Sequence, residues 1–370
     1  MSVAPEGGGD DAALLALRTQ IDGVDRELLA LLNRRAGLAL QVGEVKKHSG
    51  GVVFRPEREA QVIDGLKAAN AGPLQSDSVA PIWREIMSAC RALERRMRVA
   101  YLGPAGTFSE EAALGYFGSS IERVPCTSFD EVFHSTSGGA ADFGVVPVEN
   151  STEGVVARSL DLLLHTPLFI VGETSLFVRH NLLRREASLV GIQTVLAHPQ
   201  ALAQCSAWLN EHLPQAERRA VPSNAEGARQ AAQHASLAAI ASSRAASEYG
   251  LHIAAPAIQD DAHNRTRFAI VTHPDAHPAP KPSGHDCTSL VVSVDNRPGA
   301  VHDMLVPLKA HGVSMTRFES RPARSGQWEY YFYVDLEGHP QQPHVAAALR
   351  ELRAVCAFFK VLGTYPIDVH

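Results

Sequence analysis

Residues 14–46 read LLALRTQIDGVDRELLALLNRRAGLALQVGEVK, and this stretch decides the fold of the N-terminal region. Apolar residues recur every three or four positions, as on one face of an amphipathic α-helix. Arg35 interrupts that apolar stripe, and no acid stands three or four positions away to pair with it. A cation on a buried face requires an anionic partner, so the helix predicts a small dianionic ligand. A coiled-coil seam with one polar residue that sets specificity remains the alternative.

The length of this helix predicts a second chain. A helix over residues 14–46 would be about 50 Å long, more than a compact module of about 95 residues can cover. Arg18 lies 17 residues before Arg35, which is about 25 Å along the helix axis. We therefore expect Arg18 to serve the site of its dimer mate.

The composition is that of a soluble globular protein with room for two or three domains: 370 residues, 45% hydrophobic and 20% charged. The net charge of −6 without a basic run excludes nucleic acid as an expected partner, and we expect no membrane association. Five cysteines lack C-x-x-C spacing, and their odd number argues against a disulfide framework, so the expected compartment is the cytoplasm. The Gly-rich, acidic first thirteen residues do not resemble an export signal.

Three regions of different character follow one another. Residues 11–97 are expected to be all helical, with a second helix beginning at Pro56 and a third at about Ser76. Residues 98–273 alternate between strands and helices, which is typical of an α/β domain. Strands are expected at 99–102, 143–148, 169–178, 194–197, 237–241 and 267–272. After a Pro- and His-rich linker, residues 286–370 follow the order strand, helix, strand, strand, helix, strand, which predicts a ferredoxin-like sandwich.

Charged residues gather at and near the apolar stripe of the helical region. They are Arg18, Arg35, Lys46, Arg55, Arg58, Glu59 and Glu94. The start LLALR at 14–18 and the run RPERE at 55–59 resemble the all-helical type of chorismate mutase. That family rearranges chorismate to prephenate in a pericyclic step, in which fixed cations stabilise the charge that develops on an ether oxygen.

The resemblance implies a role for each of these side chains. Arg18 of one chain and Arg35 of the other would hold the two substrate carboxylates. Lys46 would donate to the ether oxygen, Arg58 would orient the substrate, and Glu59 would accept a hydrogen bond from the substrate hydroxyl.

Three positions depart from the family pattern. Arg55 stands where an aspartate is expected, and Cys90 and Glu94 stand where a serine and a glutamine are expected. Glu94 can donate to the ether oxygen only when it is protonated, which requires that burial raise its pKa. The alternative is an exposed glutamate at a helix end.

The α/β region holds four polar runs next to expected strands: GPAGTFS at 103–109, PVENSTEG at 147–154, AHPQ at 197–200 and NRTRF at 264–268. Thr107 and Glu110 fit a capping box, so the N–H groups at that helix start are free to face an anion. Taken together, these runs resemble prephenate dehydratase over residues 98–273. The resemblance implies two α/β lobes like those of periplasmic binding proteins, a cleft between them, and a last strand that returns to the first lobe.

Prephenate aromatises by losing its ring carboxylate as CO₂ and its ring hydroxyl as water, so the hydroxyl needs a positioned proton donor. The resemblance assigns that donor to Thr266. The implied substrate-binding residues are Asn150, Ser151, Gln200, Gln204, Arg267, which would pair a carboxylate, and Phe268. His198 ranks below Thr266 as an acid or base, because Pro199 begins a helix and His198 can fix that turn. Metal-ligand spacing and nucleotide-binding loops are missing from the sequence, so neither a metal nor a cofactor is expected.

The last region resembles the amino-acid-binding ACT module of the same dehydratases. The run NRPGAV at 296–301 stands at a strand-to-helix turn, where the positive helix start suits an α-carboxylate. The implied effector is phenylalanine, held by Gly299, Ala300, Glu319, Ser320, Arg321 and Pro322. In the alternative interpretation, Gly299 only allows the turn and Arg321 is solvated.

The three resemblances point to one interpretation: a multidomain, bifunctional enzyme that acts on chorismate and prephenate and is inhibited by phenylalanine. A homodimer or higher homo-oligomer is expected. One alternative is a dehydratase whose helical domain only dimerises the chain, and a second is a two-lobed ligand-binding sensor.

Overall fold

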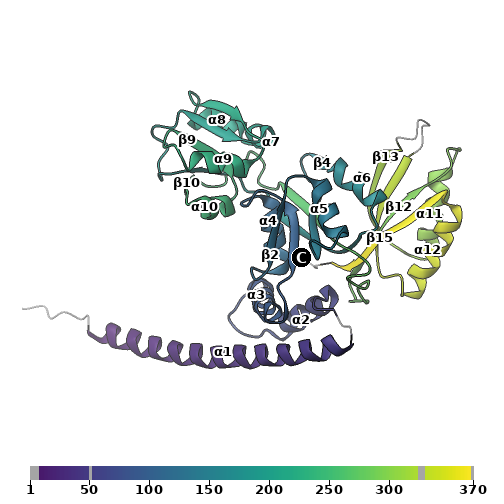
Figure 1. The fold of residues 1–370 in the computed structure, drawn as a ribbon, viewed down its shortest axis with the longest axis horizontal. Coiled ribbons are helices and arrows are strands. Elements are labelled where there is room, and N and C mark those ends of the chain that lie inside the picture. The colour runs from purple at the N-terminus through teal and green to yellow at the C-terminus, as the bar shows by residue number, and fades with distance from the viewer. Residues whose placement is uncertain (1–7, 50–51, 324–329, 368–370) are drawn as a thin grey trace, which may run out of the picture.

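The computed structural model describes residues 8–49, 52–323 and 330–367. Figure 1 shows three parts in chain order: a helical domain, a two-lobed α/β domain, and an α/β sandwich at the C-terminal end. Within these ranges, no helix combines the length and the apolar character that a bilayer span requires.

The helical domain consists of α1 (Gly8–Ser49), α2 (Pro56–Ala69) and α3 (Ser76–Glu94). The expected starts of the second and third helices are confirmed, and proline occupies the first turn of α2, where its missing N–H costs nothing. Only the C-terminal part of α1 lies beside α2 and α3, and the rest projects away from the body of the chain (Figure 1).

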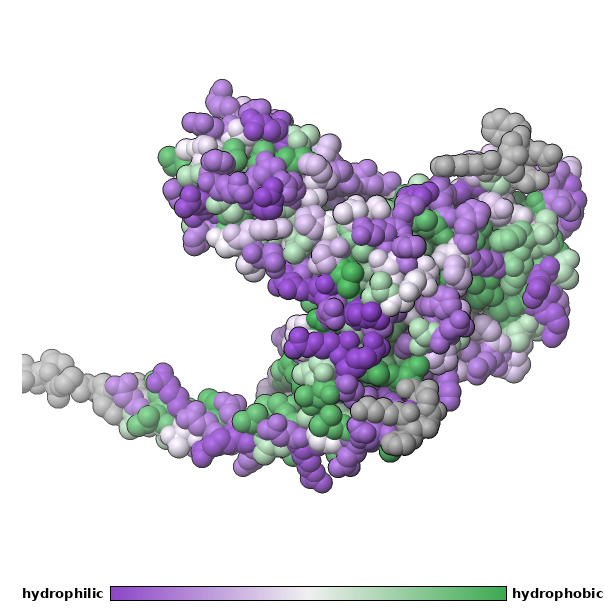
Figure 2. All heavy atoms as spheres, in the orientation of Figure 1, coloured by the Kyte–Doolittle hydropathy of each residue, from purple (hydrophilic) through white to green (hydrophobic). Residues whose placement is uncertain are grey.

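The apolar stripe of α1 faces solvent in the single chain. Leu17 is 56% exposed, Val24 63% and Leu31 60%, although each is apolar and stands on the same helix face. Figure 2 shows green apolar side chains interspersed along the projecting part of α1. An exposed row of large apolar side chains along one helix face is typical of an interface with another protein chain.

Lobe one of the α/β domain is built on five strands in the order β5-β11-β3-β1-β2. They are β1 (Arg98–Leu102), β2 (Glu122–Cys126), β3 (Phe143–Asn150), β5 (Phe169–Phe177) and β11 (Arg265–Thr272), with the short β4 (Gly154–Val155) beside β3. Its helices are α4 (Phe108–Phe117), α5 (Phe129–Ser137) and α6 (Ala157–His165). The chain leaves for lobe two after β5 and returns as β11, which pairs antiparallel with both β3 and β5, as expected.

Lobe two has a five-stranded sheet in the order β10-β6-β9-β7-β8. Its strands are β6 (Asn181–Arg184), β7 (Thr194–Ala197), β8 (Glu217–Ala220), β9 (Leu237–Ala241) and β10 (His252–Ala255). Its helices are α7 (Pro199–Gln204), α8 (Ser206–His212), α9 (Asn224–Ala231) and α10 (Ser243–Tyr249). The expected β7 and β9 are confirmed, whereas the strand pattern missed β8, because all four of its residues are exposed.

The C-terminal domain has the expected order of elements. They are β12 (Asp286–Ser293), α11 (Ala300–Ala310), β13 (Met315–Pro322), β14 (Tyr330–Glu337), α12 (Pro343–Val355) and β15 (Phe358–Pro366). Its sheet, in the order β13-β14-β12-β15, continues directly into lobe one, because β15 lies beside β5 with Gly363 opposite Ile170. The two domains therefore share one sheet.

Gly363 makes this junction possible. A Cβ atom at this position would collide with the backbone of Ile170, which cannot move aside as a flexible side chain can. Gly363→Ala is therefore expected to destabilise the chain by about 1–3 kcal/mol, the usual cost of overpacking. Gly115→Ala in α4 is the matched control, because a Cβ there meets nothing within 4 Å. Thermal unfolding measures the melting temperature of each variant. Melting temperatures that fall equally in both variants, or in neither, would contradict this role of Gly363.

Candidate active sites

A cavity of about 260 Å³ lies between the two lobes. Asn150 and Thr266 line it from lobe one, and His180, Gln200 and Gln204 line it from lobe two. Four of the residues predicted from the sequence are thus brought together. They come from the ends of β3 and β11 and from α7, elements that are far apart in the chain.

The side chain of Asn150 orients the hydroxyl of Thr266. Its Nδ2 donates to Thr266 Oγ1 at 2.8 Å and to Asn264 Oδ1 at 2.8 Å. Its Oδ1 accepts from the backbone N–H groups of Thr152 and Glu153, each at 3.0 Å. Both ends of the Asn150 amide are therefore fixed. Because the Thr266 oxygen already accepts a hydrogen bond, its own proton is free to be donated to another group.

His180 is a cavity residue that the sequence interpretation missed. Gln204 Nε2 donates to Glu153 Oε1 at 3.3 Å, and Gln204 Oε1 lies 3.0 Å from His180 Nε2. Since the Gln204 oxygen can only accept, His180 Nε2 carries the proton and Nδ1 is bare. Burial lowers the pKa of His180, and its Nδ1 has no hydrogen-bond partner among the described residues. A lone histidine before a short strand has no spacing that marks it.

The N-cap residues of four helices line this cavity, and two of these helices, α4 and α9, have eight residues or more. Thr107 caps α4 by accepting from the Glu110 N–H at 3.3 Å, and Ser223 caps α9 by accepting from the Glu226 N–H at 3.1 Å. The Glu110 carboxylate accepts from the Gly106 N–H at 2.6 Å and not from that of Thr107, so the Thr107 half of the expected capping box is present. Arginine and lysine do not occur among the residues that line this cavity. Positive potential in the cavity therefore comes from helix starts and backbone N–H groups.

Three predicted substrate-binding residues do not line this cavity. Arg267 points to the other side of the sheet, where its Nη2 lies 2.8 Å from Asp335 Oδ2, because neighbouring residues of a strand face opposite sides. Phe268 is 2% exposed and belongs to the core of lobe one. Ser151 Oγ accepts from the Arg265 N–H at 2.9 Å, which ties the end of β3 to β11.

His198 fixes a helix start. Its Nδ1 accepts from the Gln200 N–H at 3.3 Å, and its own N–H donates to Asn224 Oδ1 at 2.9 Å. The sequence placed His198 below Thr266 as a candidate acid or base. This arrangement agrees with that order, because a ring nitrogen that caps a helix is already engaged before a substrate binds.

The second candidate site lies where α1, α2 and α3 meet. Glu59 forms an ion pair with Arg91, whose Nη2 also donates to the Phe117 carbonyl at 2.6 Å and whose guanidinium lies 5.0 Å from the Phe54 ring. Burial first, and the nearby charge of Arg35 second, lower the pKa of Arg91 to about 10, against the opposing effect of Tyr116. Arg91 was missed from the sequence, because it adjoins an apolar stripe without interrupting it.

The other predicted residues of this site are spread over the helical domain. Glu94 packs against Gly43 of α1, where a Cβ would lie 2.7 Å from the Glu94 Cδ. Lys46 Nζ donates to the Val53 carbonyl at 3.4 Å and lines a separate cavity of about 370 Å³. Arg18 and Arg58 are exposed. One chain by itself therefore does not assemble the predicted set of cations.

The predicted effector residues divide between two cavities. Gly299 and Ala300 line one of about 220 Å³ at the start of α11, where Gly299 has a φ of +80° that favours glycine. Ser320 is exposed and stands opposite Phe332, which also lines this cavity.

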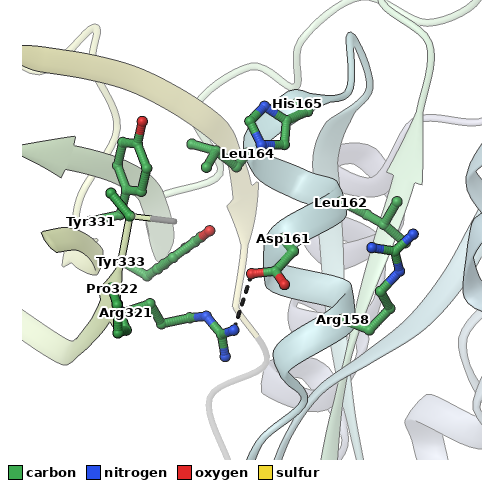
Figure 3. Close-up of a pocket in the computed structure, with 10 residues that line it drawn as sticks. Arg158, Asp161, Leu162, Leu164, His165, Arg321, Pro322, Tyr331 and Tyr333 are labelled. Atoms are coloured by element: carbon green, nitrogen blue, oxygen red, sulfur yellow. Dashed lines mark ion pairs between the residues drawn. The ribbon is translucent and has the colours of Figure 1, made fainter. Parts of the chain in front are cut away.

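Arg321 and Pro322 line a different cavity, of about 510 Å³, between α6 and the strands β13 and β14. Figure 3 shows the Arg321 guanidinium directed across it toward Asp161 of α6, and the two groups lie 3.1 Å apart. Glu319 is half-buried and, by strand alternation, shares the face of Arg321. In the single chain these residues therefore do not share one cavity, and their common role in binding an effector stays a prediction.

No cluster of three or more histidine, cysteine or carboxylate side chains that could hold a metal ion occurs within the described ranges.

Comparison with known proteins places each domain in a family. The family model of type II chorismate mutase matches residues 17–95, that of prephenate dehydratase 99–276, and that of the ACT domain 288–354. A bifunctional chorismate mutase/prephenate dehydratase of Neisseria gonorrhoeae is 47% identical over 97% of this chain and 98% of its own length. The bifunctional chorismate mutase/prephenate dehydratase of Pseudomonas aeruginosa is 44% identical over 96% of this chain and 98% of its own length.

A solved structure agrees with these relatives. The prephenate dehydratase of Arthrobacter aurescens, in complex with L-Phe, is 34% identical, with a TM-score of 0.67 over 73% of this chain and 90% of its own. The helical, two-lobed and ferredoxin-like parts described above occur in the order in which the three family models match. The chain therefore belongs to the family of bifunctional chorismate mutase/prephenate dehydratases, with an ACT domain after the two enzyme domains.

Proposed function

We propose that the cleft between the two lobes dehydrates prephenate, with Thr266 as the proton donor. The observation that carries this proposal is the hydrogen bond from Asn150 Nδ2 to Thr266 Oγ1, which leaves the Thr266 proton as the one available for donation. The ring hydroxyl of prephenate is the leaving group and departs as water when it receives that proton. Decarboxylation supplies the electron pair that completes the aromatic ring, so the reaction needs no separate base.

The carboxylates of prephenate require a new assignment, because Arg267 faces away from the cleft. We propose that the starts of α4 and α9 hold them, since Thr107 and Ser223 cap these helices at the cavity wall. Gln200 and Gln204 supply amide groups from the opposite lobe. Conversion of added prephenate to phenylpyruvate, followed by absorbance, tests the proposal, which requires that the Thr266→Ala chain lose this conversion.

We propose that the helical domain rearranges chorismate within a homodimer. The apolar face of α1 supports this proposal, because the stripe over residues 14–31 is exposed in one chain and a second copy of the chain would bury it. Arg35 lies near the buried pair of Arg91 and Glu59. In the proposed dimer, the partner subunit's Arg18 completes this site, and Lys46, Arg58 and Glu94 keep the roles that the family resemblance implies.

The remaining expectations stay predictions. They are the domain limits 11–97, 98–273 and 286–370, a cytoplasmic location, and function without a cofactor, a metal or nucleic acid. The free thiols described in the structure agree with a reducing compartment.

We propose that phenylalanine inhibits the enzyme by binding at the cavity of Gly299 and Ala300. The start of α11 supplies N–H groups for its carboxylate, and Phe332 supplies an apolar wall. Ser320 stands beside this wall.

Gly299→Ala combined with Ser320→Ala is expected to weaken phenylalanine binding at least tenfold, because the first change strains a residue at φ +80° and the second removes a hydroxyl. Both catalytic activities should persist. Gly312→Ala is the matched control: Gly312 has a φ of +64° at the other end of α11. Calorimetric titration with phenylalanine that finds unchanged binding in the double variant would place the effector elsewhere.

A further inference from the structure

The two strands that carry the proposed catalytic groups present a second face to the regulatory domain. Thr266 pairs with Asn150 in the register of β11 and β3, and their side chains meet at the cleft. The next pair in the same register is Arg267 with Glu149. Because alternate residues of a strand face opposite sides, Arg267 and Glu149 lie behind the catalytic pair.

A matching pair approaches from the C-terminal domain. Arg317 of β13 and Asp335 of β14 also stand opposite each other in the strand register. Arg317 Nε lies 3.0 Å from Glu149 Oε2, and Asp335 Oδ2 lies 2.8 Å from Arg267 Nη2. The contacts within each register pair are longer: 3.7 Å from Arg267 Nε to Glu149 Oε2 and 3.9 Å from Arg317 Nη1 to Asp335 Oδ2. These four residues form a charge quartet with alternating signs. Arg267 Nη1 also lies 3.5 Å from Glu173 Oε2 of β5, which accepts from the Tyr365 hydroxyl of β15 at 3.1 Å.

The quartet is held firmly on its regulatory side. The Asp335 side chain is 5% exposed and that of Arg317 12% exposed. Asp335 Oδ1 also accepts from Ser289 Oγ at 2.6 Å. A buried carboxylate that loses its cation is strongly disfavoured, so Asp335 and Arg267 are expected to move together. The quartet thereby links the sheet of the C-terminal domain to β11.

Other contacts cross the same domain boundary without reaching the catalytic strands. Lys360 Nζ of β15 donates to three carbonyls at the end of α6, those of Leu163 and Leu164 at 2.9 Å and of Thr166 at 2.7 Å. Arg321 pairs with Asp161 of α6 (Figure 3). These contacts fix α6 and not β3 or β11. Of these contacts, only the quartet includes residues of β3 and β11 that stand next to Asn150 and Thr266.

We propose that Glu149 and Arg267 are positioning residues, and that Arg317 and Asp335 hold them so that the regulatory domain sets the alignment of Asn150 with Thr266. This inference rests on the proposed roles of Thr266 and of phenylalanine. Phenylalanine inhibits the dehydratase by favouring an arrangement of the ACT domain in which the quartet no longer supports the catalytic alignment, which is a coupling between distinct sites.

The test compares Arg317→Gln with the control Lys360→Met in the full-length protein. Arg317→Gln is chosen because its partner Glu149 is partly solvated, at 39% exposure, so the change does not leave a deeply buried lone charge. Each variant is assayed for dehydratase kcat and KM on added prephenate, with and without saturating phenylalanine. Phenylalanine binding is measured by calorimetry, and mutase turnover reports on the integrity of the rest of the chain.

Arg317→Gln is expected to lower kcat by about tenfold with little change in KM, because small misplacements of a catalytic group are costly. Phenylalanine is still expected to bind. The ratio of the uninhibited rate to the inhibited rate should fall at least about fivefold, because coupling between two linked sites changes an equilibrium by at least about that factor. Glu149→Gln is expected to do the same, and the double variant to be no worse than either single one, because both changes break one connection. Lys360→Met should leave kcat and the inhibition ratio unchanged.

Wild-type kcat and full inhibition in Arg317→Gln would overturn the proposal, and so would equal uncoupling by Lys360→Met. A wild-type enzyme that ignores phenylalanine would refute the effector role alone, and the kcat comparison between Arg317→Gln and Lys360→Met would then decide the positioning role. Thr266→Ala assayed alongside separates the two claims: normal turnover in that variant refutes Thr266 as proton donor without changing what the Arg317 comparison measures.

Discussion

Thr266→Ala is expected to lower the dehydratase kcat by about 10²- to 10⁴-fold, the range that a positioned proton donor contributes. KM should change much less, because the hydroxyl proton is transferred only in the transition state. The physical basis is the 2.8 Å hydrogen bond from Asn150, which holds the Thr266 oxygen as an acceptor and leaves its proton for the substrate. Steady-state rates of phenylpyruvate formation from added prephenate measure both constants.

Thr266→Ser is the matched control for this change. Serine keeps the hydroxyl and loses only the methyl group, so it should retain a substantial part of the activity. A Thr266→Ala chain with near-normal turnover would show that the proton comes from another group at the cavity. His180, with its bare Nδ1, and His198 are then the next side chains to replace.

Arg35→Ala is expected to reduce chorismate turnover at least about 10²-fold, because it removes a cation that holds a substrate carboxylate, and a misplaced substrate reacts far more slowly. Dehydration of added prephenate should remain largely intact, because the two sites are built from different domains. Arg35 lies near the buried Arg91 of the helical domain, and the cleft of Thr266 lies between the two lobes. Equal loss of both activities in a folded Arg35→Ala chain would contradict separate sites.

Sharing of the mutase site between two chains has a stricter test. Arg18→Ala chains and Arg35→Ala chains are each expected to be inactive on chorismate. After subunit exchange, a mixed dimer regains one site that contains both arginines, so part of the activity should return. Exchange is verified first by the transfer of a fluorescent label. Verified exchange without recovery would show that Arg18 and Arg35 do not meet across the proposed dimer.

Much of the fold was predictable because each domain follows a local rule. Pro56 marks the start of α2, since its ring suits the first helical turn, and the strand at 194–197 is apolar after its first residue. The strand β8 was not predicted, because its residues Glu217–Ala220 are exposed and do not alternate between apolar and polar. Its place is fixed by hydrogen bonds to β7, a distant segment that no local pattern names.

The cleft was only partly predictable for a related reason. The run at 264–268 brings Thr266 to the cavity between the lobes, but a motif does not state which side of the sheet each residue faces. Strand alternation alone separates Thr266 from Arg267. A register shift between Arg267 and Phe268 and the burial of Phe268 in the lobe-one core complete the correction. Arg267 therefore contacts Asp335 of the regulatory domain, a partner that only the folded chain reveals.

The most direct test of the account follows chorismate through the purified full-length protein. Wild-type protein is expected to form prephenate transiently and then phenylpyruvate. The Thr266→Ala chain should stop at prephenate, and the Arg35→Ala chain should leave chorismate unconverted while still dehydrating added prephenate. Phenylpyruvate formed from chorismate at the wild-type rate by either variant would contradict the central claim that one chain carries two separate active sites built around these residues.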